Sequence, residues 1–222
     1  MKKTIAFDVY GTLIDTKGTL SLLKGFVGSK ALLFAETWRT KQLEYSFRRG
    51  LMKQYAHFSV CTRDALNFTC MALEVNLTDE QKKALLESYL YLPAFDDVET
   101  TLRQLSQHYQ LVAFSNGEYD AVTSLLNHAN ISHYFSNVVT ADGVETFKPN
   151  PEIYQYLLAR AESTAENTWL ISSNPFDVIG AKSFGLKAAW VKRSSAAVYD
   201  PWGIEPNITI NNLESLFLQL SK

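Results

Sequence analysis

The sequence predicts an α/β fold in which a doubly wound parallel sheet carries a helical cap domain inserted near its N-terminus. Two observations support this prediction. Short apolar runs typical of buried strands alternate with helical stretches along most of the chain, as in parallel sheets with helices on both faces. A much longer helical segment interrupts the alternation after the first strand, and it is too long for a loop in a compact domain. We therefore expect a Rossmann-like core with an inserted cap.

Five apolar runs are predicted to be strands, and a sixth is a candidate edge strand. The five are Thr4–Phe7, Leu111–Phe114, Asn137–Thr140, Thr168–Ile171 and Lys187–Val191, and the sixth is Ile208–Ile210. Helices are predicted between most of them, at residues 98–108, 119–128, 152–161 and 178–184, with a terminal helix from Asn212. Parallel crossovers are almost always right-handed, so helices should cover both faces of the sheet.

Residues 15–93 are predicted to form the cap, and residues 1–14 and 94–222 the core. A 3.6-residue period in the cap predicts a helix, one side of which carries Ala31, Phe34, Ala35, Trp38, Gln42 and Tyr45. A second helix should begin at Thr78, because Gln81 three residues later completes a capping box. We expect the aromatic residues of this segment to pack as the core of the cap rather than to bind a ligand.

Composition limits the classes of partner. A chain of 222 residues that is 46% hydrophobic can bury a substantial core, and its net charge of -2 comes with scattered basic residues that give no nucleic-acid footprint. No apolar run is long enough to span a membrane, and the first strand follows Met1 too closely for a signal peptide. Two cysteines and four histidines show no disulfide framework and no metal-ligand spacing. We therefore expect a cytoplasmic protein without a nucleic-acid or membrane partner.

Polar side chains follow four of the predicted strands. They are Asp8 after the first strand, Ser115 and Asn116 after the second, Lys148 beyond the third and Ser172–Asp177 after the fourth. Each also has an ordinary interpretation, as a turn residue or as a surface lysine. The carboxyl ends of parallel strands meet at one edge, where open α/β sheets place their chemistry. Two carboxylates, an ammonium and a hydroxyl–amide pair at one edge favour an active site.

The segments around these residues resemble the haloacid dehalogenase superfamily, and more narrowly its type II L-2-haloacid dehalogenases. The superfamily resemblance rests on Asp8–Thr12, Ser115-Asn116, Lys148-Pro149 and Asp177. The narrower resemblance rests on three longer segments, Phe7–Thr12, Trp38–Tyr45 and Ser172–Ala181. The resemblance extends essentially from end to end of the chain.

This resemblance implies hydrolysis of short (S)-2-haloacids to (R)-2-hydroxyacids and halide. Asp8 would attack C2 and invert it, forming an aspartyl ester that water then hydrolyses. The ligands expected are a small 2-haloalkanoic acid and water, with no cofactor and no metal. The family also suggests a homodimer.

The same resemblance implies roles for individual residues. Lys148 would keep Asp8 ionised, and Asp177 would pair with Lys148 and help to activate water. Tyr154 would support this pair, although structural packing also accounts for a tyrosine there. Arg39 alone would be interpreted as a solvated arginine of a helix, but the match around it favours the site. The other implied residues are Thr12, Ser172 and Asn174 for the nucleophile and the water, Ser115 with the backbone amides of Val9, Tyr10 and Asn116 for the substrate carboxylate, and Arg39, Asn116 and Phe176 for the halide.

Two alternatives remain, a phosphatase-like hydrolase and a non-catalytic relative. Most of the superfamily are Mg²⁺-dependent phosphatases with a second aspartate two residues after the nucleophile and another in the last motif. Tyr10 and Ser173 stand at those positions here. A phenol with an ordinary pKa of about 10 is a poor general acid, and Mg²⁺ needs several hard oxygen ligands, so phosphoryl transfer is disfavoured. The non-catalytic alternative conflicts with the presence of Asp8, Lys148 and Asp177.

Overall fold

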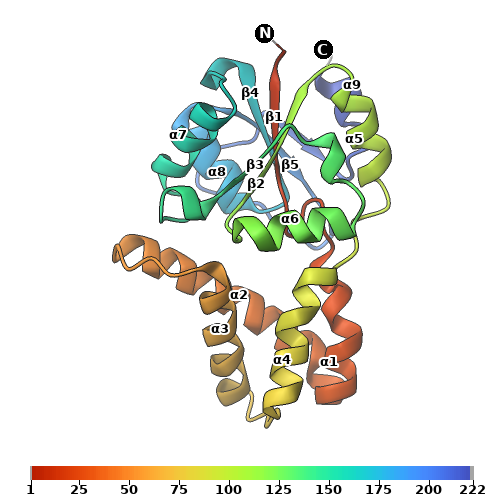
Figure 1. Cartoon of the computed structure of the whole chain (residues 1–222), viewed down its shortest axis with the longest axis vertical. Helices are drawn as coiled ribbons and strands as arrows, with labels where there is room; N and C mark the ends of the chain where they lie inside the picture. Colours follow the sequence, from red (N-terminus) through yellow and green to blue (C-terminus); the bar gives the residue numbers. More distant parts are fainter. Residues whose placement is uncertain (1, 221–222) are drawn as a thin grey trace.

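The structure, a computed structural model, describes residues 2–220, and this part of the chain forms a six-stranded parallel sheet in the order β3-β2-β1-β4-β5-β6 (Figure 1). The strands are β1 (Thr4–Asp8), β2 (Gln110–Ser115), β3 (Asn137–Thr140), β4 (Thr168–Ser172), β5 (Lys187–Val191) and β6 (Ile208–Ile210). The predicted doubly wound parallel sheet is confirmed. Strand β1 lies between β2 and β4, so its carboxyl end is flanked by the ends of both neighbours.

Side chains of the sheet alternate between two buried layers, as the pleat of a strand requires. On β1, Ile5 and Phe7 pack on one face with α5 (Val98–Ser106), α6 (Tyr119–His128) and α9 (Leu216–Leu220). Ala6 packs on the other face with α7 (Pro151–Arg160) and α8 (Pro175–Phe184). The helices cover both faces of the sheet, as Figure 1 shows.

The segment after β1 folds into a separate helical lobe below the sheet in Figure 1. Its helices are α1 (Leu20–Val27), α2 (Ala31–Leu51), α3 (Phe58–Ala72) and α4 (Asp79–Ser88), with a 3-10 turn η3 (Tyr89–Tyr91) after α4. They enclose their own hydrophobic core, which includes Phe34 and Trp38 of the predicted helical face and the buried cysteine Cys70. The predicted capping box at Thr78 and Gln81 is present. The inserted helical cap is therefore confirmed.

Two antiparallel linkers join the cap to the core. The backbone N–H of Asp15 donates to the carbonyl of Pro93 at 2.8 Å, and that of Phe95 donates to Leu13 at 3.0 Å. The boundaries predicted at 14/15 and 93/94 lie at this crossing, and we propose them as the limits of the cap. A second contact holds the cap to the core at a distance from the linkers, where the Tyr55 hydroxyl donates to Asp142 at 2.5 Å.

Two helices begin three or more residues away from the predicted start, for local reasons. Helix α8 begins at Pro175 rather than at Val178, because proline suits the first turn of a helix, where its missing N–H is not needed. Helix α9 begins at Leu216 rather than at Asn212, because the Leu213 N–H donates to Asp97 of the core at 2.7 Å instead of joining a helix. Both differences leave the site end of the sheet unchanged.

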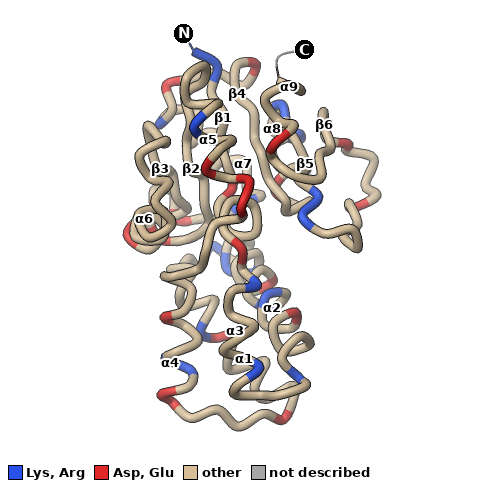
Figure 2. The backbone as a smooth tube through the Cα atoms, turned by 90° about the vertical axis from the view of Figure 1, so that its right-hand side faces the viewer, with Lys and Arg blue, Asp and Glu red and all other residues tan. Residues whose placement is uncertain are grey.

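The structure shows how charged and apolar residues are distributed over the two lobes. Lys and Arg alternate with Asp and Glu over both lobes without a single-sign stripe (Figure 2). Among the helices described, none combines the length and the apolar character needed to cross a membrane. Cys61 and Cys70 are both buried free thiols.

Candidate active site

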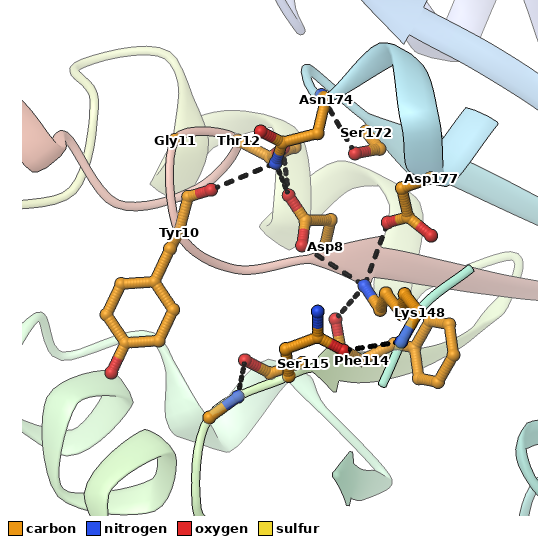
Figure 3. A network of polar contacts seen from close by, with 12 residues as sticks. Asp8, Tyr10, Gly11, Thr12, Phe114, Ser115, Lys148, Ser172, Asn174 and Asp177 are labelled. Atoms are coloured by element: carbon orange, nitrogen blue, oxygen red, sulfur yellow. Dashed lines mark hydrogen bonds and ion pairs between the residues drawn. The ribbon is translucent and has the colours of Figure 1, made fainter. Parts of the chain in front are cut away.

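Asp8 ends the central strand β1, and the residue is 7% exposed. Its Oδ2 accepts hydrogen bonds from the Thr12 hydroxyl at 2.7 Å and from the Asn174 amide at 2.8 Å. Its Oδ1 accepts from the Lys148 ammonium at 3.1 Å (Figure 3). Two donors therefore occupy Oδ2, whereas Oδ1 has one and keeps a lone pair available.

The chain turns sharply after Asp8, and this turn brings Thr12 back to the carboxylate. Gly11 makes the turn with a φ of +84°, a backbone conformation that residues other than glycine rarely adopt. The Thr12 carbonyl is held by Arg193, whose Nη2 donates to it at 2.7 Å. Arg193 also pairs with Asp97 at 2.6 Å. Arg193 therefore holds the main chain of the loop that carries the Thr12 hydroxyl.

Lys148 is the centre of the polar network, although only 1% of it is exposed. Its ammonium donates to Asp8 Oδ1, to Asp177 Oδ2 at 2.8 Å and to the backbone carbonyl of Phe114 at 2.8 Å. The ammonium also lies 4.1 Å from the centre of the Phe114 ring. All three of its N–H bonds can thus be satisfied, which a buried charge requires.

Burial and neighbouring charges act in opposite directions on this network. Burial alone lowers the pKa of Lys148, but the charges of Asp177 and Asp8 outweigh it and hold the pKa above its usual value. Burial, with a further contribution from Asp8, raises the pKa of Asp177 overall, although Lys148 and the Tyr154 hydroxyl act to lower it. We take Asp177 to be ionised because donors reach both of its oxygens, at 2.8 Å from Lys148 and at 2.9 Å from Tyr154.

Tyr154 of α7 lies fully buried behind Asp177. Its hydroxyl donates toward the Asp177 carboxylate, and burial together with that neighbouring charge raises the pKa of Tyr154 well above the usual value. A side chain at position 180 would collide with the Tyr154 hydroxyl, so Gly180 of α8 leaves the space that the tyrosine fills. Tyr154 therefore contacts Asp177 directly, as its predicted role beside the Lys148–Asp177 pair requires.

The loop after β4 supplies Asn174 through a set of local hydrogen bonds. The Ser172 hydroxyl accepts from the Asn174 backbone N–H at 3.1 Å, so Ser172 positions Asn174 and acts on Asp8 through it. Ser173, which was not among the predicted site residues, donates to the Gly11 carbonyl at 2.7 Å. Its backbone N–H donates to the Thr12 hydroxyl at 2.8 Å. The loops after β1 and β4 are therefore tied together beside the carboxylate.

Ser115 and Asn116 end β2 with donors left for a ligand. The Ser115 hydroxyl accepts from the Gly117 N–H at 3.0 Å, which leaves the hydrogen of the hydroxyl available for donation. The Asn116 side-chain oxygen accepts from the Lys148 backbone N–H at 2.8 Å, so its amide offers N–H groups to the space in front of it. Both residues are buried.

The cap adds Arg39 from helix α2. Its Nη1 donates to the Gln42 side-chain oxygen at 3.0 Å, and Gln42 in turn donates to the Thr62 hydroxyl at 2.6 Å. Gln42 is only 1% exposed, so the guanidinium is oriented by a buried partner on its own helix. The core residue Phe176 packs against Phe47 of α2, with ring centres 5.0 Å apart.

These side chains enclose a cavity of about 20 Å³ between the cap and the end of the sheet, which we call the catalytic cavity. Its walls are Asp8, Tyr10, Arg39, Leu43, Phe58, Ser115, Asn116, Lys148, Asn174 and Phe176. The volume is near that of one or two waters, so only a very small ligand fits without movement of the walls. A carboxylate with an available oxygen thus faces cationic and amide donors in a nearly closed space, which suits a displacement that expels an anion.

The two positions that distinguish the metal-dependent relatives hold no carboxylate. Tyr10 projects away from the network in Figure 3, and burial, reinforced by the neighbouring Tyr89, raises the pKa of its phenol and keeps it neutral. Ser173 is occupied with the backbone of Gly11. Among residues 2–220, no group of three or more His, Cys, Asp or Glu side chains is arranged to hold a metal ion. The donor set around Asp8 is a poor fit for Mg²⁺, because the Lys148 ammonium lies within it.

The structure brings together most of the predicted site residues. One hydrogen-bonded network contains Asp8, Thr12, Lys148, Tyr154, Asn174 and Asp177. The catalytic cavity is lined by three members of this network, Asp8, Lys148 and Asn174, and by the predicted residues Tyr10, Arg39, Ser115, Asn116 and Phe176. The side chain of Val9 is fully buried in the core. Only the backbone amide of Val9 can therefore make the predicted contact with the substrate carboxylate. Ser172 contacts Asn174 rather than Asp8.

Five residues contribute to the site without having been predicted as site residues. Gln42 and Leu43 could have been found, since they lie three and four residues after Arg39 and share its side of a helix. Phe58, Ser173 and Arg193 gave no local signal, because their roles depend on loops and on packing between distant segments.

Comparisons with known proteins agree with this geometry. A family model described as a haloacid dehalogenase-like hydrolase matches residues 2–185. The (S)-2-haloacid dehalogenase 2 of Pseudomonas sp. (strain CBS-3) is 35% identical over 96% of this chain and 93% of its own length. Haloacetate dehalogenase H-2 of Moraxella sp. (strain B) is 32% identical over 97% of each chain.

Solved structures extend the similarity to three dimensions. The L-2-haloacid dehalogenase from Xanthobacter autotrophicus with chloropropionic acid covalently bound has a TM-score of 0.93 at 28% identity, covering 100% of this chain and 99% of that chain. The L-2-haloacid dehalogenase RSc1362 has a TM-score of 0.95 at 25% identity, with 100% and 99% covered. The chain therefore belongs to the haloacid dehalogenase-like hydrolases, and among them to the (S)-2-haloacid dehalogenases.

Proposed function

We propose that this protein hydrolyses short (S)-2-haloacids to (R)-2-hydroxyacids and halide through an ester on Asp8. The observation that carries the proposal is the small catalytic cavity in which Asp8 faces Arg39 and Asn116. A covalently bound chloropropionic acid in the Xanthobacter relative supports the ester route. A phosphatase is less well supported, because Tyr10 and Ser173 replace the carboxylates that such enzymes use.

In the first step Asp8 Oδ1 attacks C2 in line with the carbon–halogen bond. Oδ1 is proposed because Oδ2 is already saturated by Thr12 and Asn174. The new C–O bond forms as the carbon–halogen bond breaks, and the bonding pair leaves with the halide. The leaving group needs no proton, so the site needs no acid beside it.

The halide leaves toward Arg39, Asn116 and Phe176, which line the catalytic cavity together. A guanidinium is permanently charged and weakly hydrated, and an amide N–H adds a second donor. The edge of a phenyl ring is positive and can also face an anion. The substrate carboxylate binds to Ser115 and to the backbone amides of Val9, Tyr10 and Asn116, an assignment taken from family resemblance.

In the second step water attacks the carbonyl carbon of the ester. With Oδ1 esterified, Oδ2 becomes the carbonyl oxygen and gains negative charge during attack. Thr12 and Asn174 already donate to Oδ2 at 2.7 and 2.8 Å, so they are placed to stabilise that charge. Lys148 and Asp177 orient the carboxyl group and help to activate the water. The C–O bond to Asp8 breaks, the hydroxyacid leaves, and one proton is released to solvent.

The stereochemical course tests the proposal. With racemic 2-chloropropionate, we expect halide release from the S enantiomer alone and a product of R configuration, because C2 is inverted once. Chiral chromatography of the products measures both points. Retention at C2, or equal consumption of both enantiomers, would contradict the proposed displacement. A chelator-sensitive release of phosphate from an ester, without halide release, would favour the phosphatase instead.

Two further expectations belong with this proposal. A homodimer follows from family resemblance and is tested by light scattering on the purified protein. A cytoplasmic location follows from the sequence and is tested by fractionation of the native host.

A further inference from the structure

A second and larger cavity adjoins the catalytic cavity at the junction of the cap and the core. Its volume is about 270 Å³, against about 20 Å³ for the catalytic cavity. Tyr10 and Phe58 line both cavities and form the partition between them. We call the larger space the side chamber and define it by Tyr10, Phe58, Val60, Leu86, Leu90 and Ala121.

The walls of the side chamber are largely apolar. Val60 of α3 and Leu86 of α4 contribute from the cap, and Ala121 of α6 contributes from the core. The chamber also reaches five polar residues, which are Gln42, Ser59, Thr62, Arg63 and Glu118. The Ser59 backbone N–H donates to the Glu118 carboxylate at 3.0 Å across the cap–core junction. An apolar space with a polar rim suits a hydrocarbon chain better than a charged group.

The substituents of C2 in the substrate give a second argument for a hydrocarbon chain in the side chamber. The proposed function assigns the carboxylate to Ser115 and the backbone amides, and the halide to Arg39, Asn116 and Phe176. The remaining substituent faces the apolar wall formed by Tyr10, Leu43 and Phe58. A cavity of about 20 Å³ leaves no room there for more than a very short chain. Past Tyr10 and Phe58, a longer chain would enter the side chamber, which shares these two residues with the catalytic cavity.

Tyr10 is suited to act as a movable partition. Its backbone carbonyl accepts from the Asn174 amide at 3.3 Å, so the main chain beside Asp8 is held in place. Its ring lies 6.4 Å from that of Tyr89 in a tilted arrangement, which is a common contact geometry for two aromatic rings. Rotation of the Tyr10 side chain would join the two cavities and leave its hydrogen-bonded main chain, and with it the neighbouring Asp8, in place.

We propose that the side chamber is a second subsite that takes the hydrocarbon chain of longer 2-haloalkanoates, with Tyr10 and Phe58 as the gate. This proposal rests on the proposed function and extends its substrate class beyond two- and three-carbon acids. A further cavity of about 310 Å³ is lined by Arg39, Ala35 and Tyr89 among others. This cavity shares the charged Arg39 with the catalytic cavity, whereas the side chamber shares Tyr10 and Phe58. A hydrocarbon chain is not expected to enter it, so a substitution in this cavity is the control for substitutions in the side chamber.

The test compares 2-bromohexanoate with 2-bromopropionate, using the full-length protein and halide release as the assay. We expect the wild type to convert both acids. Ala121→Phe, which fills the side chamber from the core, should lower the ratio of kcat/KM for the six-carbon acid to that for the three-carbon acid by about tenfold or more. Val60→Phe fills the chamber from the cap and should lower the same ratio, so the test does not depend on the folding of one variant.

The matched control is Ala35→Phe, which places the same ring in the further cavity lined by Arg39 and should leave the ratio unchanged. An equal fall of the ratio in Ala35→Phe would overturn the proposal, as would unchanged ratios in both chamber variants. Conversion of 2-bromopropionate but not of 2-bromohexanoate by the wild type would overturn the side chamber and leave the proposed function standing. Halide release from neither acid would overturn both.

Discussion

Lys148 in the core donates to two carboxylates and a backbone carbonyl and is 1% exposed, whereas Arg39 in the cap is half-buried and donates to Gln42 of its own helix. The core half of the site is a closed network fixed by the ends of four strands. The cap half supplies a cation whose position relative to Asp8 depends on how the cap sits on the core. The geometry around the proposed nucleophile is therefore built into the sheet, while the proposed halide binding by Arg39 would depend on the position of the cap.

This difference has an energetic basis. A buried ammonium is tolerated because its carboxylate and carbonyl partners compensate for lost hydration, and removal of one partner leaves an unpaired buried charge. A partly exposed guanidinium keeps much of its hydration, so it contributes little to stability. Substitutions in the core should consequently affect both folding and chemistry, and substitution of Arg39 should affect chemistry more than folding.

Asp8→Asn should have the largest effect and abolish halide release, because an amide is not a nucleophile at C2. Single-turnover hydrolysis by the wild type in ¹⁸O-water should place label in the Asp8 carboxylate, since water attacks the ester carbonyl. Mass spectrometry of the Asp8 peptide measures this label. Label found only in the hydroxyacid would point to direct attack by water and contradict the ester route.

Lys148→Met should lower kcat by about a hundredfold or more and also lower the free energy of unfolding by roughly 3–5 kcal/mol. The loss of stability follows because Asp177 keeps its burial and loses its cationic partner. Urea unfolding of the variant measures the change. In the double variant Lys148→Met/Asp177→Leu, part of the stability should return while activity stays lost. A single variant as stable as the wild type would show that the network is not the stabilising element described here.

Arg39→Ala should lower the rate of halide release by about a hundredfold, or roughly 3 kcal/mol, which is typical for one donor at developing charge. Its free energy of unfolding should fall by no more than about 1–3 kcal/mol, because Arg39 lies outside the Lys148 network and only the buried Gln42 side-chain oxygen loses its donor. Arg48→Ala on the same helix is the matched control, since Arg48 pairs with Glu44 on the cap surface. A near-normal rate with reduced stability would identify Arg39 as a structural residue.

The core half of the site could be predicted from the sequence, because strand ends in a parallel sheet converge at one edge. Asp8, Lys148 and Asp177 follow apolar runs that give clear strand signals, and the strands were located to within about a residue. The resemblance then supplied their roles. What the sequence could not provide is the distribution of hydrogen bonds between the two Asp8 oxygens, which distinguishes the attacking atom.

The cap half was harder to predict. Arg39 was identified through the match around it, but Gln42 was seen only as part of a helical face, and Phe58 was not singled out. Contacts between a cap and a core depend on docking of two surfaces, which has no period in the sequence. The same reason applies to the side chamber, whose walls come from segments as distant as Val60 and Ala121.

Exhaustive chelation should have the smallest effect and leave dehalogenation unchanged. Metal-dependent relatives use carboxylates at the positions of Tyr10 and Ser173, and here a neutral phenol and a hydroxyl bonded to Gly11 replace them. The Lys148 ammonium beside Asp8 supplies the positive charge that a metal ion would otherwise provide. Halide release measured after dialysis against EDTA, and again after addition of Mg²⁺, tests this. A rate that collapses with EDTA and returns with Mg²⁺ would mean that a cation, rather than Lys148, completes the core half of the site, and the contrast between a self-sufficient core and a contributing cap would then fail.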